Sequence, residues 1–224
     1  DFIGIPSKRT KILFEDGLPF EDCCKWTSLG PINLGLGRFQ EISCFHEPTG
    51  SLHVTDAIVG IDSNPPKIFD YDPSPLLFHS RERGDELLVD SPEKRKKGWA
   101  RLVLFASYLR PSKLKIPSLN HVAKYSFKKG LRNKKSHFGI YPFLWDKDWE
   151  ESIEVIIGEN SPKIQIAPVL QRLIFPRSKE LLCSWLNVVK NFKGMKYLIS
   201  AHYSSPLEFS EIDCQKIIDN INSD

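Results

Sequence analysis

Two side chains that could build a functional site directly follow or end predicted β-strands. Asp56 ends the segment Ser51-Leu-His-Val-Thr-Asp56, and His202 comes immediately after the segment 195–201. Sites in α/β proteins usually form at the carboxyl ends of strands, where side chains from separate loops can meet. Each residue also has a structural interpretation. Asp56 would then accept backbone N–H bonds at the end of its strand, and the His202 imidazole would be satisfied by polar neighbours.

The other histidines are scattered, and none of the six is placed at HxH, HxxxH or another compact ligand spacing. His53 shares one face of its predicted strand with Thr55, opposite Leu52 and Val54. His79 begins the cluster His79-Ser-Arg-Glu-Arg83, in which Arg81 also carries a charge. We therefore treat His53, His79 and Arg81 as candidate pocket residues. A surface network of ion pairs is the favoured alternative for the cluster.

Several common enzyme motifs do not occur in the sequence. There is no GxxxxGK[ST] or GxGxxG phosphate-binding loop, no GxSxG nucleophile elbow and no HExxH zinc motif. These observations exclude the most readily recognised nucleotide-binding, serine-hydrolase and metalloprotease classes. No pair of cysteines has CxxC spacing, so a zinc ribbon and a thioredoxin-type motif are excluded as well.

Two basic clusters could contact an anionic partner. The first is Lys94 to Lys97, and the second extends from Lys128 to Lys135, close to Tyr125, Phe127 and Phe138. With 31 basic and 28 acidic residues, the formal net charge is only +3. This balance favours ordinary solvated surfaces, so we do not expect nucleic acid to be a partner.

Local sequence signals define most of the expected elements. The segments 41–46 and 51–61 form a predicted β-hairpin around the turn Glu47-Pro-Thr-Gly50. The first forty residues have too many Gly and Pro residues for a long element, and 62–90 forms a long connection. The predicted helices are 92–109 after the N-cap Ser91, 146–157, 178–192 and a last one from Ser210; the predicted strands are 162–168 and 195–201. This alternation predicts an α/β fold.

Length and composition are those of a globular α/β domain. A chain of 224 residues with 41% hydrophobic and 26% charged residues fits a single domain over 1–224. No apolar run reaches the roughly 20 residues of a membrane span, and the chain contains no signal-peptide pattern. We expect a reducing compartment, cytoplasm or plastid stroma, and no membrane partner. Because the chain begins with Asp1, we also expect that it was processed or is part of a longer protein.

A set of segments spread over most of the chain resembles a known family. The hairpin 41–56 resembles the segment of metallo-β-lactamase-fold proteins that carries the bridging aspartate, and Ile199-Ser-Ala-His202 looks like the strand end that carries their last metal-binding histidine. The whole chain is similar to an uncharacterised cyanobacterial and plastid family of that superfamily. The supporting segments are Gly30 to Gly37, Pro75 to Arg83, Ser91 to Trp99, Gly139 to Phe143 and Ala167 to Leu173.

The resemblance implies a fold and a function. It implies an αββα sandwich and a hydrolase-like protein in which Asp56 and His202 would ligate zinc, manganese or iron and act on a small-molecule substrate. The superfamily's HxHxDH motif does not occur in the chain, so the resemblance implies a degenerate or incomplete metal site and a missing part of the N-terminal half. The alternative is a non-catalytic binding or scaffold domain that retains the fold.

Overall fold

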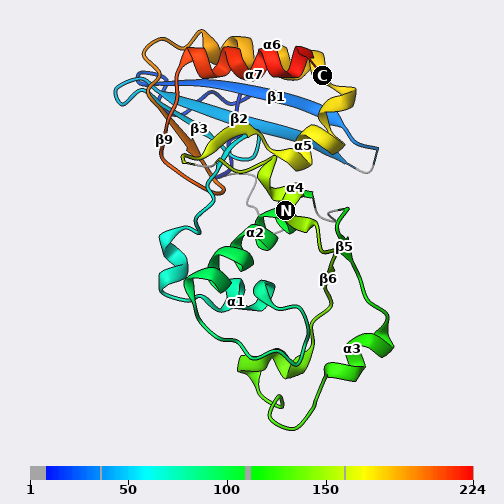
Figure 1. The fold of residues 1–224 in the computed structure, drawn as a ribbon. Helices are drawn as coiled ribbons and strands as arrows, with labels where there is room; N and C mark the ends of the chain where they lie inside the picture. Colours follow the sequence, from blue (N-terminus) through cyan, green and yellow to red (C-terminus); the bar gives the residue numbers. More distant parts are fainter. Residues whose placement is uncertain (1–8, 36, 109–111, 159, 224) are drawn as a thin grey trace. The chain divides into compact units, whose positions relative to one another are not determined.

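A computed structural model describes residues 9–35, 37–108, 112–158 and 160–223 (Figure 1). The chain has the predicted mixed α/β composition, with a five-stranded mixed sheet and two small two-stranded sheets within the described residues. Contacts divide it into two compact units, a subdivision that length alone does not predict. The first unit holds 1–57, 175–201 and 205–224, and the second holds 58–174 and 202–204.

The first unit is built on the five-stranded sheet, in the order β1-β2-β3-β8-β9. Its strands are β1 (Cys24–Asn33), β2 (Arg38–His46), β3 (Ser51–Val54), β8 (Tyr197–Ser200) and β9 (Leu207–Glu208). Neighbouring strands are antiparallel except β3 and β8, which run parallel with Val54 opposite Ser200. This parallel pair places the carboxyl ends of β3 and β8 at the same edge of the sheet.

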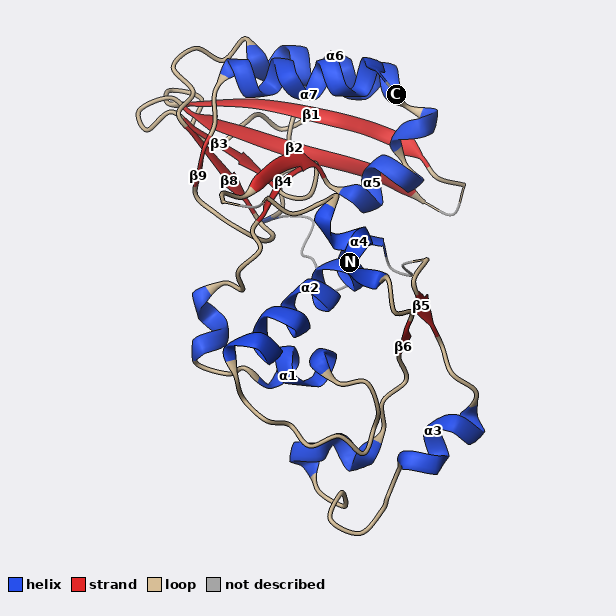
Figure 2. Ribbon diagram, in the orientation of Figure 1, coloured by secondary structure: helices blue, strands red, loops and turns tan. Residues whose placement is uncertain are grey.

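Two C-terminal helices cover one face of this sheet (Figure 2). They are α6 (Lys179–Lys190) and α7 (Glu211–Ser223), preceded in the chain by the short 3-10 helix η4 (Phe175–Arg177). The ring of Phe45 is fully buried and stacks on Phe192 with centroids 5.3 Å apart, and the same face of β2 also buries the polar side chains of Glu41 and Ser43. The buried face of β2, set by its two-residue alternation, and the buried face of α6, set by its 3.6-residue period, therefore belong to the same core.

The second unit contains the small sheets and the remaining helices. Its strands are β4 (Ile58–Ile61) paired with β7 (Lys163–Ile166), and β5 (Leu114–Lys115) paired with β6 (Leu144–Trp145). Its helices are η2 (Lys67–Asp70), α1 (Ser74–Ser80), α2 (Pro92–Tyr108), α3 (Leu119–Tyr125), η3 (Lys134–Gly139), α4 (Trp149–Glu154) and α5 (Pro168–Leu173). Every helix within the described ranges is too short or too polar to cross a bilayer.

Helices α1 and α2 pack against each other at Gly98. A Cβ atom at this position would lie 1.8 Å from the backbone oxygen of Leu76, so no larger residue fits without moving the helices. This close contact fixes the position of α1 against the middle of α2. His79 and Arg81 lie at the C-terminal end of α1.

Several elements differ from the sequence predictions, and each difference has a local cause. The segment 24–33 is a strand and not irregular, because a register shift between Leu29 and Ile32 accommodates Gly30 with its φ of +104°. The predicted strand 51–61 is two strands, β3 and β4, interrupted at 55–57. The predicted connection 62–90 contains η2 and α1, and the helix predicted over 146–157 is limited to α4.

The apolar spacing of the segment 92–109 predicts a buried face of Trp99, Leu102, Val103, Phe105, Ala106 and Leu109, and the structure confirms only part of it. Trp99 and Val103 are buried as expected, but Ala106 is exposed, and Leu102 and Phe105 are half-buried. The other buried positions of the helix are Gly98, Arg101, Leu104 and Ser107. The predicted end at Leu109 lies outside the described residues. The buried face therefore includes an arginine, which a search for apolar periodicity does not find.

Candidate functional site

Asp56 lies in the turn after β3, and the buried side chain of Glu41 organises this turn. The Glu41 carboxylate accepts four hydrogen bonds: Oε1 from the Thr55 N–H at 2.5 Å, and Oε2 from the Thr55 hydroxyl at 2.8 Å and from the Asp56 and Ala57 N–H groups at 3.0 and 3.1 Å. Glu41 is 0% exposed. A buried carboxylate with this many donors is fully satisfied, so the backbone that presents Asp56 is held in one conformation.

The neighbouring strand end contributes a further constraint. The Ala201 N–H donates to the Val54 oxygen at 3.2 Å and to the Thr55 oxygen at 3.4 Å. The parallel pairing of β3 and β8 thus continues for one residue beyond both strands. The Asp56 side chain is half-buried at this edge of the sheet.

His202 follows Ala201 directly but belongs to the second unit, whereas Asp56 belongs to the first. Its neighbours Tyr203 and Ser204 bind β4: Tyr203 forms a bridge with Gly60, and the Ser204 N–H donates to the Gly60 oxygen at 3.0 Å. The His202 side chain is exposed.

The resemblance to metallo-β-lactamase-fold proteins implies a metal ion, and a hydrolytic metal site needs at least three protein ligands. Within the described part of the chain, no group of three or more His, Cys, Asp or Glu side chains could hold one. The residues therefore do not supply a complete ligand set for this metal. The assignment of Asp56 and His202 as ligands stays a prediction.

His53 lies in the first unit, apart in the chain from the other two candidate pocket residues. It is on β3, opposite Cys44 of β2 and Ile199 of β8. Burial, and to a smaller extent the charge of the nearby His46, lowers the pKa of His53. His79 and Arg81 belong to the second unit, where both contact Phe78 and face the segment 136–143.

Charged side chains and aromatic rings surround these two residues; we call this group the arginine cluster. Its members are His79, Arg81, Glu82, Arg101 and Tyr141, with the rings of Phe78, Phe143, Trp145 and Trp149 around them. The side chains of Arg81 and Arg101 are each 1% exposed. Full burial of two guanidinium groups is unusual, because arginine almost never leaves solvent unless it is paired.

Arg101 is compensated. Its Nη2 donates to both carboxylate oxygens of Glu82 at 2.9 and 3.0 Å, and its Nη1 donates to the Arg81 backbone oxygen at 2.9 Å. Its guanidinium also lies 4.8 Å from the ring centroid of Trp149 and 5.3 Å from that of Trp145. Burial alone would raise the pKa of Glu82, but Lys97 and Arg101 hold it below its ordinary value.

Arg81 has weaker partners. Within the described ranges, its Nη atoms donate only to the backbone oxygens of Gly84, Ser136 and Ile140, at 3.4, 3.3 and 3.5 Å. No carboxylate of the described residues forms an ion pair with it; Glu86 acts on its charge only from longer range and is itself paired with Lys94. Its Nε has no hydrogen-bond partner among the described residues. Among the residues that the structure describes, Arg81 is therefore a buried positive charge without a counterion.

His79 extends this electropositive environment. Its Nδ1 is buried without a hydrogen-bond partner in the described part of the structure, as is the Nε of Arg101. Burial, and then the charges of Arg101 and Arg81, lower the pKa of His79 to about 4. The imidazole is thus neutral at physiological pH and can offer one N–H donor. Burial also raises the pKa of Tyr141 to about 12, which keeps its hydroxyl protonated.

Sequence reasoning found His79 and Arg81 but missed Arg101 and Tyr141. Arg101 occupies a position of α2 between the buried residues Trp99 and Val103, and a charged residue on a buried helix face was the available signal. No local signal identifies Tyr141, which reaches the cluster from 62 residues away and donates to the His79 oxygen at 3.3 Å.

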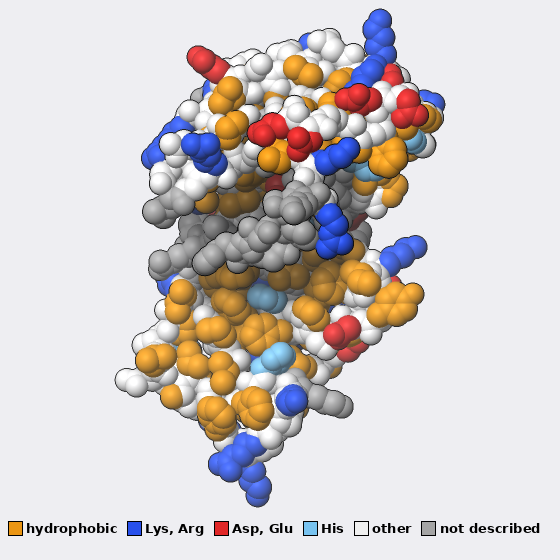
Figure 3. Space-filling view, turned by 180° about the vertical axis from the view of Figure 1, so that it is seen from behind, with side chains coloured by type: hydrophobic (Ala, Val, Ile, Leu, Met, Phe, Trp, Pro, Cys, Tyr) orange, Lys and Arg blue, Asp and Glu red, His pale blue; other side chains and the backbone are white. Residues whose placement is uncertain are grey.

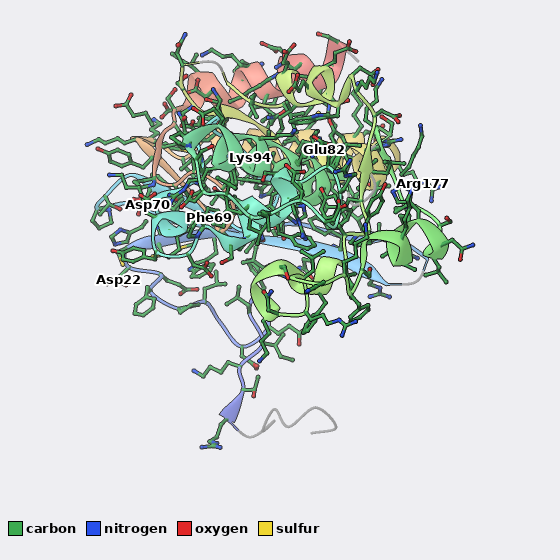
Figure 4. The ribbon with its side chains drawn as sticks, turned by 60° about the horizontal axis from the view of Figure 1, so that its bottom comes forward. Asp22, Phe69, Asp70, Glu82, Lys94 and Arg177 are labelled. Atoms are coloured by element: carbon green, nitrogen blue, oxygen red, sulfur yellow. The ribbon has the colours of Figure 1, made fainter. Side chains whose placement is uncertain are left out.

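The basic cluster at the start of α2 is largely neutralised. Lys94 pairs with Glu86, Lys97 pairs with Glu82, and Arg95 pairs with both Asp90 and Asp70 (Glu82, Lys94 and Asp70 are labelled in Figure 4). A cavity of about 670 Å³ lies beside these residues and includes Arg95 and Asp90 in its lining. Because these charges are already paired, we expect the cavity to bind an anion less well than Arg81 does.

These features define a mixed α/β protein with a constrained turn at Asp56 in one unit and a buried arginine cluster in the other. The chain belongs to the family described as a domain of unknown function, DUF4336, whose model matches residues 1–219. No curated protein and no solved structure matches the chain.

The first prediction concerns Glu41. In Glu41→Gln, the new NH₂ group would face backbone N–H donors that now share the carboxylate, leaving buried donors unsatisfied. We expect a loss of about 2–4 kcal/mol in the free energy of unfolding, from several charge-assisted bonds at about 1.5–3 kcal/mol each and partial rearrangement. Urea titration measures this loss. Glu47→Gln, at an exposed ion pair with Lys25, should change stability by less than about 1 kcal/mol.

The second prediction concerns the pH dependence of stability. Because the folded pKa of His79 is about 4 and the ordinary value is 6.5, the unfolded chain binds more protons between these pH values. The stability that neutral His79 supports is present above pH 6.5 and is lost as the pH falls toward 4, by on the order of 3 kcal/mol.

The measurement is urea unfolding at several pH values across this interval. In His79→Gln the dependence on pH should be clearly flatter than in the wild type. His121→Gln removes an imidazole elsewhere in the second unit and should leave the dependence unchanged. Equal slopes in the wild type and His79→Gln would contradict the assignment.

Proposed function

We propose that this chain is a non-catalytic binding domain and that the arginine cluster binds a small molecule with an anionic group, a carboxylate or a phosphate. The observation that carries the proposal is Arg81, which is 1% exposed and has no carboxylate partner among the described residues. A buried charge is costly unless it is paired. An anionic ligand supplies the missing counterion.

The donor chemistry of the cluster suits such a ligand. Arg81 offers its unpartnered Nε, and guanidinium groups bind carboxylate and phosphate through parallel N–H bonds. Neutral His79 adds one further donor. The rings of Phe78 and Tyr141, with centroids 4.8 and 5.0 Å from the Arg81 guanidinium carbon, provide an apolar wall that strengthens electrostatic attraction.

The long hydrogen bonds of Arg81 support a binding role rather than a purely structural one. Its three carbonyl partners lie at 3.3–3.5 Å, at the long end of hydrogen-bond distances, so exchanging one of them for an anion costs little. Arg101, by contrast, is held by a bidentate carboxylate and has the geometry of a structural ion pair.

The test uses inorganic phosphate and succinate as probes, with sodium chloride at matched ionic strength. Binding at ten times Kd stabilises the folded state by about 1.4 kcal/mol, which raises Tm by roughly 3–5 °C for a chain of this size. The wild type should show this rise over chloride with at least one probe, and Arg81→Met should lose it. Arg83→Met, at an exposed neighbouring arginine, is the matched control.

Phosphate also stabilises proteins in general by exclusion from their surface. The informative quantity is therefore the difference in Tm shift between the wild type and Arg81→Met. If both proteins shift equally with both anions, the arginine cluster does not bind them and the proposal is contradicted.

At the level of fold, we propose that the chain is related to the metallo-β-lactamase superfamily, with an αββα sandwich architecture. Three features of the backbone support this relationship. Strands β3 and β8 are parallel neighbours, Asp56 follows Val54 by two residues, and His202 follows the paired residue Ser200 by two residues. In the chain, helix α6 precedes strand β8 and His202 follows that strand. This is the order of helix, strand and histidine that the resemblance implies.

One observation favours a second candidate function, a hydrolase-like protein with an incomplete metal site. Glu41 fixes the backbone of Asp56 through four hydrogen bonds, which is the kind of support that functional side chains require. Metal analysis of the purified protein tests this candidate. Stoichiometric zinc, manganese or iron that is lost in both Asp56→Ala and His202→Ala would support it, and metal retained in both variants would contradict it.

A further inference from the structure

The acidic residues of the chain are distributed very unevenly. From Lys94 to Trp145 the sequence contains 14 basic residues and no Asp or Glu, whereas the rest of the chain contains 17 basic and 28 acidic residues. The nearly neutral total, from which we did not expect a nucleic-acid partner, therefore averages two regions of opposite sign. The basic region belongs entirely to the second unit.

The charge of the first part of this region is largely compensated, but that of the second part is not. Lys94, Arg95 and Lys97 pair with acidic residues, as described above. In the segment 116–140, four exposed basic residues have no carboxylate partner among the residues that the structure describes. They are Lys124, Lys129, Arg132 and Lys134.

Large hydrophobic side chains are exposed in the same segment. Leu119 is 87% exposed, Ile116 is 68% exposed and Phe127 is 55% exposed. Phe138 and Ile140 are partly exposed as well. Figure 3 shows hydrophobic side chains gathered over the face of the second unit that includes this segment, with Lys and Arg side chains at its end. We call the residues 116–140 the basic–apolar surface.

The backbone holds the two phenylalanine side chains together at this surface. The Phe127 N–H donates to the Phe138 oxygen at 2.7 Å, and their ring centroids are 6.0 Å apart. Phe127, His137 and Phe138 all have positive φ, between 51° and 55°. Bulky residues rarely adopt this conformation, and where they do the surrounding contacts enforce it, often at functional sites. Here it holds two rings at a surface without burying them.

We propose that the basic–apolar surface binds the surface of a membrane that contains anionic lipids. Exposed aliphatic and aromatic side chains among lysines and arginines are typical of interfacial membrane binding, in which the apolar groups enter the acyl boundary and the basic groups contact phosphate headgroups. A nucleic acid would also attract the charges and stack on Phe127, but Ile116 and Leu119 cannot stack on bases. The two aliphatic side chains, the most exposed of the surface, favour the lipid.

The test is sedimentation with vesicles of phosphatidylcholine alone and of phosphatidylcholine mixed with phosphatidylserine. The wild-type chain should bind the mixed vesicles far better than the neutral ones, and binding should fall as sodium chloride is added. Phe127→Asn and Phe138→Asn remove the rings with a residue that tolerates positive φ. Each should lower the partition coefficient roughly tenfold or more.

A charge variant tests the second component independently. Lys129→Gln combined with Lys134→Gln should lower the partition coefficient about 25-fold, from about fivefold per charge. The matched controls lie in the first unit: Ile212→Asn, at a side chain 67% exposed, and Lys193→Gln should leave binding unchanged. Thermal unfolding of each variant confirms that the fold is retained.

Three results would overturn the proposal. These are failure of the wild type to bind mixed vesicles at low salt, equal binding to both kinds of vesicle, and binding that the variants of this surface leave unchanged. Polyuridylate provides a separate comparison. If the chain binds this RNA at the same salt and does not bind vesicles, the surface recognises nucleic acid.

Discussion

The burial of full charges is the constraint on which both units depend. In the part of the chain that the structure describes, three charged side chains are almost completely removed from solvent: Glu41 in the first unit, and Arg81 and Arg101 in the second. Each one connects segments that are distant in the chain. Glu41 holds the turn after β3, Arg101 joins α2 to the segment after α1, and Arg81 joins that same segment to residues 136–140.

These three charges differ in how their burial is offset. Glu41 is satisfied by four donors of one turn, and Arg101 by a bidentate carboxylate, a carbonyl oxygen and two indole rings. Both are therefore structural groups whose removal should destabilise the fold. Among the described residues, Arg81 has only long contacts to carbonyl oxygens and no carboxylate partner, beside a histidine whose neutral form is also stabilised by burial. This difference is why we assign binding to Arg81 and support to the other two.

Much of the fold could be predicted because its signals are local. The hairpin of β2 and β3 was predicted from the turn 47–50 and its alternation, and it is confirmed by the pairing of Phe45 with Leu52. The start of α2 at Pro92, the position of α6 to within two residues at each end and the start of α7 after Ser210 are also confirmed, since caps and 3.6-residue periodicity are properties of short segments.

The remainder depended on contacts between distant residues. The break between β3 and β4 follows from Glu41, a residue 14 positions before Thr55, so the strand 51–61 could not be divided from its own sequence. His79 and Arg81 could be proposed together because only one residue separates them in the chain. Arg101 and Tyr141 join them only through packing of α2 and of the segment 141–149, which no local pattern encodes.

The measurement that tests the central claim most directly is urea unfolding of Arg81→Met and Glu82→Gln without added anions. If Arg81 lacks a counterion, replacing it with an apolar side chain of similar length leaves stability unchanged or raises it, by up to about 4 kcal/mol. Glu82→Gln, which removes the counterion of Arg101, lowers stability by about 1–3 kcal/mol. A loss of stability in Arg81→Met as large as that in Glu82→Gln would contradict the account, because the contacts of Arg81 within the fold would then already compensate its charge.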